Sequence, residues 1–209
     1  MLTVVGNLKG GTGKSTVAFN LAVWLAHDKA GVMAFDLDPQ CTLVDVCEVR
    51  AEDGYEPVVK VSTDLDELEA MASDKKRKQP IIVDMSVGNM PAMEKAISLA
   101  DRILIPVQPS QADIWSTQRF LKIVNNCIDK NKKTEVLGFI NRADTHVGVR
   151  ETDEAEQALQ MLQGIKAIDI RLYQRTAYRR SFSEGLGVFE LDPMGKASKE
   201  MKKLAAMLD

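Results

Sequence analysis

The stretch GNLKGGTGKST, residues 6–16, follows the apolar run LTVV at residues 2–5 and precedes a segment with helical periodicity. A strand, a glycine-rich turn and a helix form the context in which G-K-[ST] marks a phosphate-binding loop. Glycines let the backbone N–H groups point inward, and the helix that follows directs the positive end of its dipole to the same place. The stretch therefore predicts a site for a highly charged anion.

The residues of this loop have distinct expected roles. We expect Lys14 to reach the β- and γ-phosphates of ATP, the Ser15 hydroxyl to hold Mg²⁺ and Thr16 to support the α-phosphate side. The loop residues predicted to bind the nucleotide are Lys9, Gly10, Gly11, Thr12, Gly13, Lys14, Ser15 and Thr16.

A dinucleotide-binding dehydrogenase is the competing class, since Asp36 ends the second apolar run, where a ribose-binding acid would lie. The glycine spacing argues against this class. A G-x-G-x-x-G frame on Gly11 and Gly13 would require glycine at position 16, which is Thr16. A lysine in the turn is also superfluous for a pyrophosphate that backbone groups hold.

Apolar runs of strand length recur along the chain, and most are separated by stretches with helical periodicity, such as residues 15–30 and 112–128. This alternation predicts an α/β fold. We expect residues 1–209 to form a single P-loop NTPase domain, with a mostly parallel, twisted sheet, helices on both faces and ligands at the carboxyl ends of the strands. The runs are LTVVGN (2–7), GVMAFDLD (31–38), PIIVDMS (80–86), RILIPVQP (102–109), EVLGFINR (135–142) and IKAIDIRL (165–172).

The loop departs from the standard G-x-x-x-x-G-K-[ST] pattern, because Leu8 replaces the first glycine and Lys9, Gly10 and Gly11 follow it. It resembles the deviant Walker motif K-G-G-x-G-K-[ST] of the ParA/MinD superfamily of ATPases. The side chain of Lys9 is expected to project away from its own nucleotide, because the loop backbone faces the ligand. In that superfamily this lysine crosses a two-fold interface to the phosphates of the partner subunit, so the resemblance implies an ATP-dependent homodimer and leaves higher-order assembly open.

Two further stretches carry carboxylates at strand ends. FDLDPQ, residues 35–40, resembles the D-x-D-P-Q motif of ParA proteins, which implies that Asp38 positions the attacking water and that Asp36 lies near Mg²⁺. IIVDMS, residues 81–86, has the apolar run ending in aspartate of a Walker B strand, so Asp84 is expected to hold Mg²⁺ through water. The predicted catalytic residues are thus Lys9, Lys14 and Asp38, and the predicted metal residues are Ser15, Asp36 and Asp84.

The later stretches ILIPVQPS and FINRAD resemble ParA segments at the edge of the nucleotide. This resemblance makes Asn141 or Arg142 a candidate for contact with adenine. An exposed polar pair in a turn is the alternative interpretation.

The charge of the chain is uneven. The formal net charge is -3, but residues 171–209 contain eight basic and five acidic residues and are net +3. A chain that is not basic throughout needs a local patch to bind nucleic acid. This region resembles the C-terminal part of ParA proteins, whose basic residues bind DNA without sequence preference; a solvated surface is the alternative. The DNA-binding candidates are Arg171, Arg175, Arg179, Arg180, Lys199 and Lys203.

Membrane association is not expected. No apolar run approaches the ~20 residues that a bilayer requires, and the first residues lack the charged segment of a signal peptide. The amphipathic stretch 193–209 could serve as a MinD-like anchor, but packing on the domain explains the same pattern. The loop begins within the first ten residues, which predicts a small ParA form without an N-terminal helix-turn-helix.

The resemblance implies a cytoplasmic, nucleoid-associated partition ATPase with slow intrinsic turnover. ATP would form the dimer, the dimer would coat DNA, and a small cargo- or centromere-binding protein would stimulate hydrolysis. Two alternatives stay open on the same fold. One is an ATPase that positions a protein cargo, and the other is a ligase that phosphorylates a small molecule.

Overall fold

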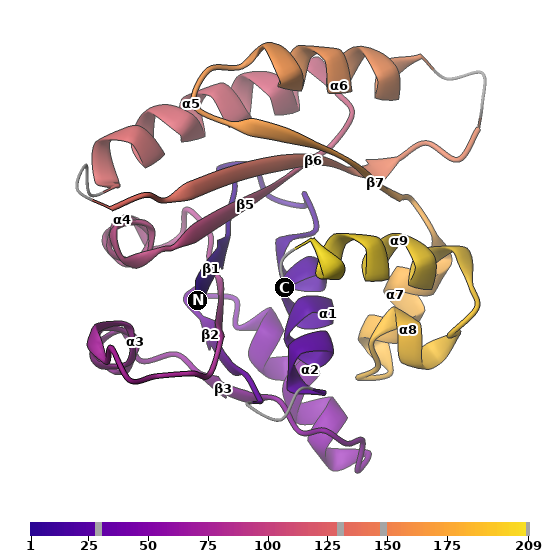
Figure 1. Cartoon of the computed structure of the whole chain (residues 1–209). Coiled ribbons are helices and arrows are strands. Elements are labelled where there is room, and N and C mark those ends of the chain that lie inside the picture. The colour runs from indigo at the N-terminus through magenta and orange to yellow at the C-terminus, as the bar shows by residue number, and fades with distance from the viewer. Residues whose placement is uncertain (28–30, 129–131, 147–149, 208–209) are drawn as a thin grey trace.

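The architecture is a seven-stranded sheet between two layers of helices, seen in a computed structural model that describes residues 1–27, 31–128, 132–146 and 150–207 (Figure 1). The strands are β1 (Leu2–Val5), β2 (Met33–Asp36), β3 (Lys60–Ser62), β4 (Ile81–Asp84), β5 (Arg102–Val107), β6 (Glu135–Ala143) and β7 (Lys166–Tyr173). The helices are α1 (Lys14–Ala26), α2 (Thr42–Glu52), α3 (Leu65–Ser73), α4 (Met90–Leu99), α5 (Gln111–Cys127), α6 (Glu151–Met161), α7 (Thr176–Ser183), α8 (Val188–Leu191) and α9 (Lys196–Ala206).

Every strand pair in the sheet is parallel, in the order β3-β2-β4-β1-β5-β6-β7. This confirms the α/β fold with a parallel sheet that the alternation of apolar runs predicts. Strand β3 was missed, because it is a three-residue edge strand with the sequence KVS and no apolar run marks it. The predicted helix 15–30 extends into residues 28–30, which lie outside the described residues.

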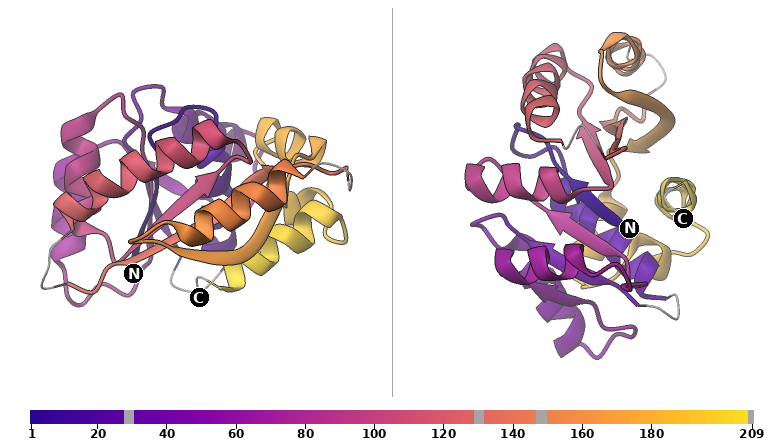
Figure 2. Two further views of the ribbon diagram at one scale, coloured as in Figure 1. Left: turned by 90° about the horizontal axis from the view of Figure 1, so that it is seen from above. Right: turned by 60° about the vertical axis from the view of Figure 1, so that its left-hand side comes forward.

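Helices cover both faces of the sheet, as the two views in Figure 2 show. Helices α1, α2, α8 and α9 contribute to one hydrophobic core, with α7 packed against it, and α3, α4, α5 and α6 contribute to the other. Side chains along a strand alternate between the cores, so Val4 lies in one and its neighbour Val5 in the other. Because both faces are buried, the strands read as continuous apolar runs.

Helix α1 is buried on most of its circumference, because the sheet covers one side and the C-terminal helices cover the other. Phe19 meets Phe182 of α7 edge to face at 5.5 Å between ring centroids, and Trp24 meets Phe189 of α8 at 5.3 Å. These aromatic pairs fix the C-terminal helices against the helix that follows the phosphate loop.

Packing accounts for the part of the amphipathic stretch 193–209 that forms α9, whereas Met194, before this helix, is 77% exposed. The apolar face of α9, formed by Ala197, Met201, Leu204 and Ala205, is buried in the same core as α1. Within the described residues, no helix combines the length and the apolar character needed to cross a membrane.

An ion pair joins α2 to the C-terminal helices. Arg50 is 1% exposed, and its guanidinium donates to both carboxylate oxygens of Glu190, at 2.7 and 2.8 Å. It also donates to the carbonyls of Pro57 and Gly185. A buried guanidinium with this many acceptors fixes the relative position of the segments that supply them.

The carboxyl ends of the central strands form the edge where ligands are expected. Strand β1 leads into α1 on one face, whereas its neighbours β4 and β5 lead into α4 and α5 on the other, so a crevice opens beyond β1. The register places Asp84 beside Val5 on one side and beside Asp36 on the other. Two of the predicted carboxylates therefore meet at the end of adjacent strands.

Candidate functional site

The glycine-rich loop lies between β1 and α1. Gly11 and Gly13 have positive φ angles of 75° and 86°, which residues with a Cβ atom rarely adopt. A Cβ atom at Gly13 would also lie 2.5 Å from the amide nitrogen of Asn141. Gly13 is the N-cap of α1, so the free N–H groups of the first helical turn face the crevice. This geometry fits the anion site that the sequence predicts.

Side chains from the ends of β5 and β6 hold the carbonyl groups of this loop. The Asn141 amide donates to the Thr12 carbonyl at 2.6 Å, while Gln108 and Arg142 donate to the Gly11 carbonyl at 2.6 and 2.7 Å. Asn141 is 6% exposed, and its amide nitrogen is used to support the loop. The proposed adenine contact of Asn141 or Arg142 stays a prediction, but the structure adds a second role for both. Gln108 was missed, although its place after an apolar run at a strand end was a usable signal.

Lys14 is buried beneath the loop, with 7% exposure. Its ammonium donates to the Lys9 carbonyl at 3.3 Å. Burial lowers the pKa of Lys14, while the negative charges of Asp84 and Asp38 raise it. The ammonium thus lies between the loop and the carboxylates, where phosphate oxygens would complete its coordination.

Asp84 is the most unusual carboxylate of the molecule. It is 0% exposed, and neither of its oxygens has a hydrogen bond of good geometry among the described residues, although the Ser15 hydroxyl lies close enough to lower its pKa. Burial raises the pKa of Asp84 to about 7, against the lowering influence of the nearby Ser15 hydroxyl and of Lys14. A buried carboxylate with free oxygens beside a serine hydroxyl and a phosphate loop fits a hydrated Mg²⁺. Among the described residues, no three His, Cys, Asp or Glu side chains could hold a metal by themselves, so such an ion would depend on phosphate oxygens as well.

Asp36 has a different environment from the one predicted. Its Oδ1 accepts the N–H of Asp38 at 3.1 Å, and its Oδ2 accepts those of Leu43 and Val44 at 2.8 and 3.1 Å. Burial nevertheless raises the pKa of Asp36. Oδ2 serves the start of α2 and Oδ1 serves the turn that carries Asp38, so the structure adds a role for Asp36 in holding this turn, and its predicted place beside Mg²⁺ stays a prediction. The strand-end position alone could not reveal this.

Asp38 lies at the rim of a cleft of about 570 Å³, within the range of ligand sites. Its Oδ1 accepts the N–H of Gln40 at 3.0 Å, which fixes the carboxylate at the turn after β2. The cleft joins the predicted phosphate loop to this turn and to the segment after β4. Its lining includes Gly10, Gly11, Gly13, Lys14, Ser15, Thr16, Asp38, Ser86 and Arg142.

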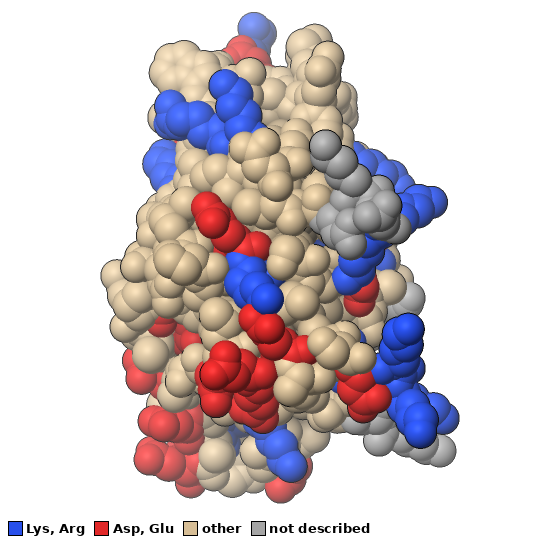
Figure 3. Space-filling model, turned by 90° about the vertical axis from the view of Figure 1, so that its left-hand side faces the viewer, with Lys and Arg blue, Asp and Glu red and all other residues tan. Residues whose placement is uncertain are grey.

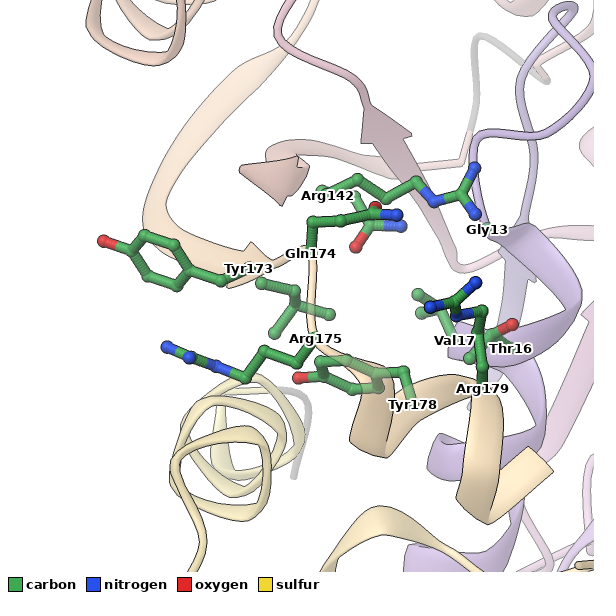
Figure 4. A pocket seen from close by; sticks show the side chains of 11 residues that line it. Gly13, Thr16, Val17, Arg142, Tyr173, Gln174, Arg175, Tyr178 and Arg179 are labelled. Atoms are coloured by element: carbon green, nitrogen blue, oxygen red, sulfur yellow. The ribbon is translucent and has the colours of Figure 1, made fainter. Parts of the chain in front are cut away.

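A second, smaller pocket opens next to the cleft, and both are lined by Gly13, Thr16 and Arg142. Figure 4 shows Arg142 extending towards Gly13 and Arg179 lying beside Thr16. Tyr178 forms another wall. The pocket therefore continues the phosphate cleft into a space lined by planar and apolar groups, and it contains Arg179, which the sequence suggests as a DNA contact.

Three other DNA-binding candidates are paired with acidic side chains. Arg171 contacts Asp153 at 2.8 Å and also pairs with Glu156, Arg175 contacts Glu200 at 2.6 Å, and Arg180 contacts Glu184 at 2.9 Å. Folding therefore brings a carboxylate to each of these three arginines and offsets part of their charge, and their contact with DNA stays a prediction. Their acidic partners lie between 4 and 25 residues away, which the charge count of the segment could not show.

The lysines of α9 are arranged differently. Lys196, Lys199 and Lys203 are exposed and follow each other at i, i+3 and i+7, so they share one side of the helix, opposite its buried face. The Lys203 ammonium donates to the Asp169 carbonyl at 3.1 Å, and no acidic partner of these three lysines occurs in the described part of the chain. This side of α9 is the more exposed basic surface.

Lys9 folds back onto helix α5. Its ammonium lies 2.5 Å from Oδ2 of Asp113, in the first turn of that helix. The side chain of Lys9 is 40% exposed and that of Asp113 is 1% exposed. Sequence reasoning missed Asp113 because it lies 104 residues from Lys9.

Comparisons with known proteins agree with this geometry. A family model described as the CobQ/CobB/MinD/ParA nucleotide binding domain matches residues 3–189. The chain is 27% identical to the maintenance of carboxysome distribution protein A of Halothiobacillus neapolitanus, over 93% of this chain and 89% of that protein. It is 28% identical to protein ParA of Rhizobium radiobacter, over 88% of this chain and 83% of that protein. The solved structure of a Cyanothece McdA–ATP complex has the same fold, with a TM-score of 0.74, 19% identity and coverage of 99% and 95%.

Proposed function

The chain belongs to the family of CobQ/CobB/MinD/ParA nucleotide-binding domains, and from this membership we propose that it is a positioning ATPase that dimerises when it binds ATP and Mg²⁺. The observation that carries the proposal is the combination of Lys14, buried beneath a glycine-rich loop, with Asp84, whose buried oxygens have no hydrogen bond of good geometry among the described residues. A merely structural turn needs neither feature. Because the strands form one sheet, we propose that residues 1–209 act as one domain.

The cleft and the adjoining pocket fit the two ends of ATP. Phosphates would lie against the loop N–H groups and Lys14, and the base would enter the pocket between Arg142 and Tyr178. Ser15 and Asp84 would hold Mg²⁺, which supplies neutralisation of the charge on the β- and γ-phosphate oxygens. Asp36 acts in this proposal by fixing the turn that carries Asp38.

Hydrolysis requires a water in line with the bond to the γ-phosphate. Asp38 is held at the rim of the cleft by the Gln40 N–H, opposite the loop, and its carboxylate is the group available to orient this water. A single oriented carboxylate in an open cleft is consistent with slow turnover until a partner closes the site. We assign that closure to the second subunit and to a small cargo-bound protein.

Lys9 is the residue that links nucleotide to assembly. Its own loop surrounds the phosphates with backbone groups, while its side chain points away, towards α5. In a two-fold dimer with facing loops, each Lys9 would reach the triphosphate of the other chain. Without triphosphate the two loops bring like charges together, so dimerisation is tied to ATP.

The proposal is tested by measuring the molar mass in solution with Mg²⁺ and a non-hydrolysable ATP analogue, with ADP, and without nucleotide. Light scattering is expected to show twice the chain mass of 23.1 kDa only with the analogue. A chain that binds the analogue and stays monomeric would contradict the proposal. A small-molecule ligase on the same fold would behave in that way, and it would convert ATP only with its substrate present.

The names of the relatives suggest two classes of cargo for this ATPase. One relative is named for carboxysome distribution and another is a ParA protein, so a protein body and a plasmid are both candidate cargoes. The chemistry of ATP-driven positioning is the same in both. Hydrolysis measured with the product of the neighbouring reading frame, with and without DNA, distinguishes them, since only a DNA cargo needs a specific DNA site for stimulation.

Non-specific DNA binding is the second part of the proposal, and we place it on α9. The side formed by α3 and α4 is unsuitable, because acidic side chains gather over the lower half of this view of the molecule (Figure 3). Helix α3 itself has two acidic residues, Asp66 and Glu67, in its first turn. Helix α9, with its exposed Lys196, Lys199 and Lys203, lies on the other face of the sheet. Exposed lysines at helical spacing can contact successive phosphates, and such binding would associate the protein with the nucleoid in the cytoplasm.

We expect the triple variant Lys196→Gln, Lys199→Gln, Lys203→Gln to weaken duplex DNA binding of the ATP-bound protein at least about tenfold near 0.1 M salt. The slope of log K against log salt should become shallower by about 0.9 for each phosphate that the variant no longer neutralises. The matched control Arg171→Gln, Arg175→Gln, Arg180→Gln removes the same charge from ion-paired side chains and should have the smaller effect. If the control loses binding and the lysine variant keeps it, the α9 surface is the wrong one.

A further inference from the structure

The contact between Lys9 and Asp113 joins the phosphate loop to the start of α5. Oδ2 of Asp113 accepts hydrogen bonds from the Lys9 ammonium, at 2.5 Å, and from the Ser110 hydroxyl. Its Oδ1 is buried and has no hydrogen-bond partner among the described residues. This carboxylate is therefore almost removed from solvent, and the charge that opposes it comes from the half-exposed Lys9.

The charge balance of this pair makes the contact costly to break. Within the described ranges, Lys9 is the only cation in an ion pair with Asp113. If Lys9 moves away, the carboxylate stays buried and keeps only the Ser110 hydroxyl and the N-terminal end of α5 as support. Lys9 itself is 40% exposed, so solvent screens part of the attraction and the lysine can still leave.

We propose that Asp113 is a positioning residue that holds Lys9 within its own chain and competes with the triphosphate of the second chain for it. This inference rests on the proposed ATP-dependent dimer. In that dimer each Lys9 must exchange a carboxylate of charge -1 for a triphosphate. Only the more highly charged anion compensates for the lost ion pair with Asp113. Asp113 thereby sets the threshold that separates ATP from ADP.

The variant Asp113→Asn tests this role, because asparagine keeps the shape of the side chain and removes the charge that retains Lys9. With Mg²⁺ and a non-hydrolysable ATP analogue, sedimentation velocity is expected to give a dimer dissociation constant about tenfold lower than that of the wild type. With ADP, the variant should dimerise measurably at concentrations where the wild type is monomeric. The binding of ADP to the monomer should not change.

Two controls assign the effect to the ion pair. In the Lys9→Ala background, Asp113→Asn should leave the dimer dissociation constant unchanged. Glu69→Gln, which removes the carboxylate of α3 that is paired with Lys95 of α4 at 2.6 Å, should leave the dissociation constant unchanged when Lys9 and Asp113 are both present. A tighter dimer in the Lys9→Ala background would overturn the proposal, since Asp113 would then act without Lys9.

A second variant and a second measurement keep the test independent of the folding of Asp113→Asn. Ser110→Ala removes the second hydrogen bond to the Asp113 carboxylate, so this buried charge depends more on Lys9, and the dimer dissociation constant should rise by a smaller factor. Each single variant, Lys9→Ala and Asp113→Asn, should lower the Tm of the nucleotide-free protein. Because the two residues interact, the sum of these two decreases should be larger than the decrease in the double variant. Additive decreases would overturn the proposal.

The outcomes separate the two proposals. If the wild type dimerises with the analogue and Asp113→Asn dimerises equally well or less well, or Ser110→Ala dimerises more tightly, the role of Asp113 is wrong and the proposed function stands. If neither the wild type nor the variants dimerise, the proposed function fails and the role of Asp113 fails with it.

Discussion

Replacing Lys9 with alanine is expected to raise the dissociation constant of the ATP-bound dimer by on the order of 10²-fold, while the monomer still binds ADP. Each charge-assisted contact across the interface contributes about 1.5–3 kcal/mol, and the dimer contains two of them, which corresponds to about 10²- to 10⁴-fold. We expect the lower end, because Lys9 gives up its 2.5 Å ion pair with Asp113 when it crosses to the other chain. Sedimentation velocity with a non-hydrolysable ATP analogue measures this change.

Lys95→Ala is the matched control for this experiment. Lys95 is 41% exposed and paired with Glu69 at 2.6 Å, so its exposure and its pairing resemble those of Lys9, yet it lies on α4, away from the phosphate loop. Its removal should not alter the dimer. If Lys9→Ala and wild type dimerise equally, the second lysine of the loop has no role in assembly, and the contact between Lys9 and a neighbouring triphosphate must be abandoned.

Replacing Asp84 with asparagine is expected to stabilise the nucleotide-free protein at high pH. The pKa of this carboxyl is about 7 in the folded chain against an ordinary value of 3.8, so the folded chain binds the proton more tightly than the unfolded chain does. Wild-type stability therefore falls as the pH rises from about 4 to 7, and the full loss, up to about 4 kcal/mol, is present above pH 7. Thermal unfolding at pH 5 and pH 8 should show the variant gaining stability mainly at pH 8.

The same variant is expected to lose ATPase activity by about 10³-fold, because several kcal/mol of transition-state stabilisation depend on a well-placed metal ion. Added Mg²⁺ and ATP should raise the Tm of the wild type at pH 8 more than that of the variant. Asp45→Asn, which changes an exposed aspartate on α2, is the control for both measurements. If the variant is less stable than the wild type at pH 8 and its ATPase activity still depends on Mg²⁺, the Asp84 carboxylate is stabilised by groups other than a cation and the prediction is wrong.

These two expectations concern opposite ends of one site. Asp84 is fully buried, which makes its charge unfavourable until a cation arrives, whereas the side chain of Lys9 is 40% exposed and its charge is paired with Asp113. Nucleotide binding would relieve the first imbalance and compete with the second. ATP with Mg²⁺ is the ligand whose charges match both, because it brings a cation to Asp84 and a highly charged anion to Lys9.

The sequence by itself determined the parallel α/β fold and the phosphate loop. Both are written in contiguous residues: apolar runs that need burial on two faces, and glycines beside Lys14 and Ser15 that leave N–H groups free at a helix start. It also placed Asp36 and Asp84 at one edge, because parallel strands end together.

The tertiary structure alone decided which of these groups are free to act. Asp36 and Asp84 look equivalent in the sequence, but the oxygens of Asp36 accept backbone N–H groups of Asp38 and of the start of α2, whereas neither oxygen of Asp84 has a well-formed hydrogen bond among the described residues. In the C-terminal segment, Arg171, Arg175 and Arg180 likewise became ion-paired, and Lys9 became paired with Asp113. The physical reason is that hydrogen bonding and charge pairing depend on which distant segments folding brings within about 3 Å, and no local pattern encodes that distance.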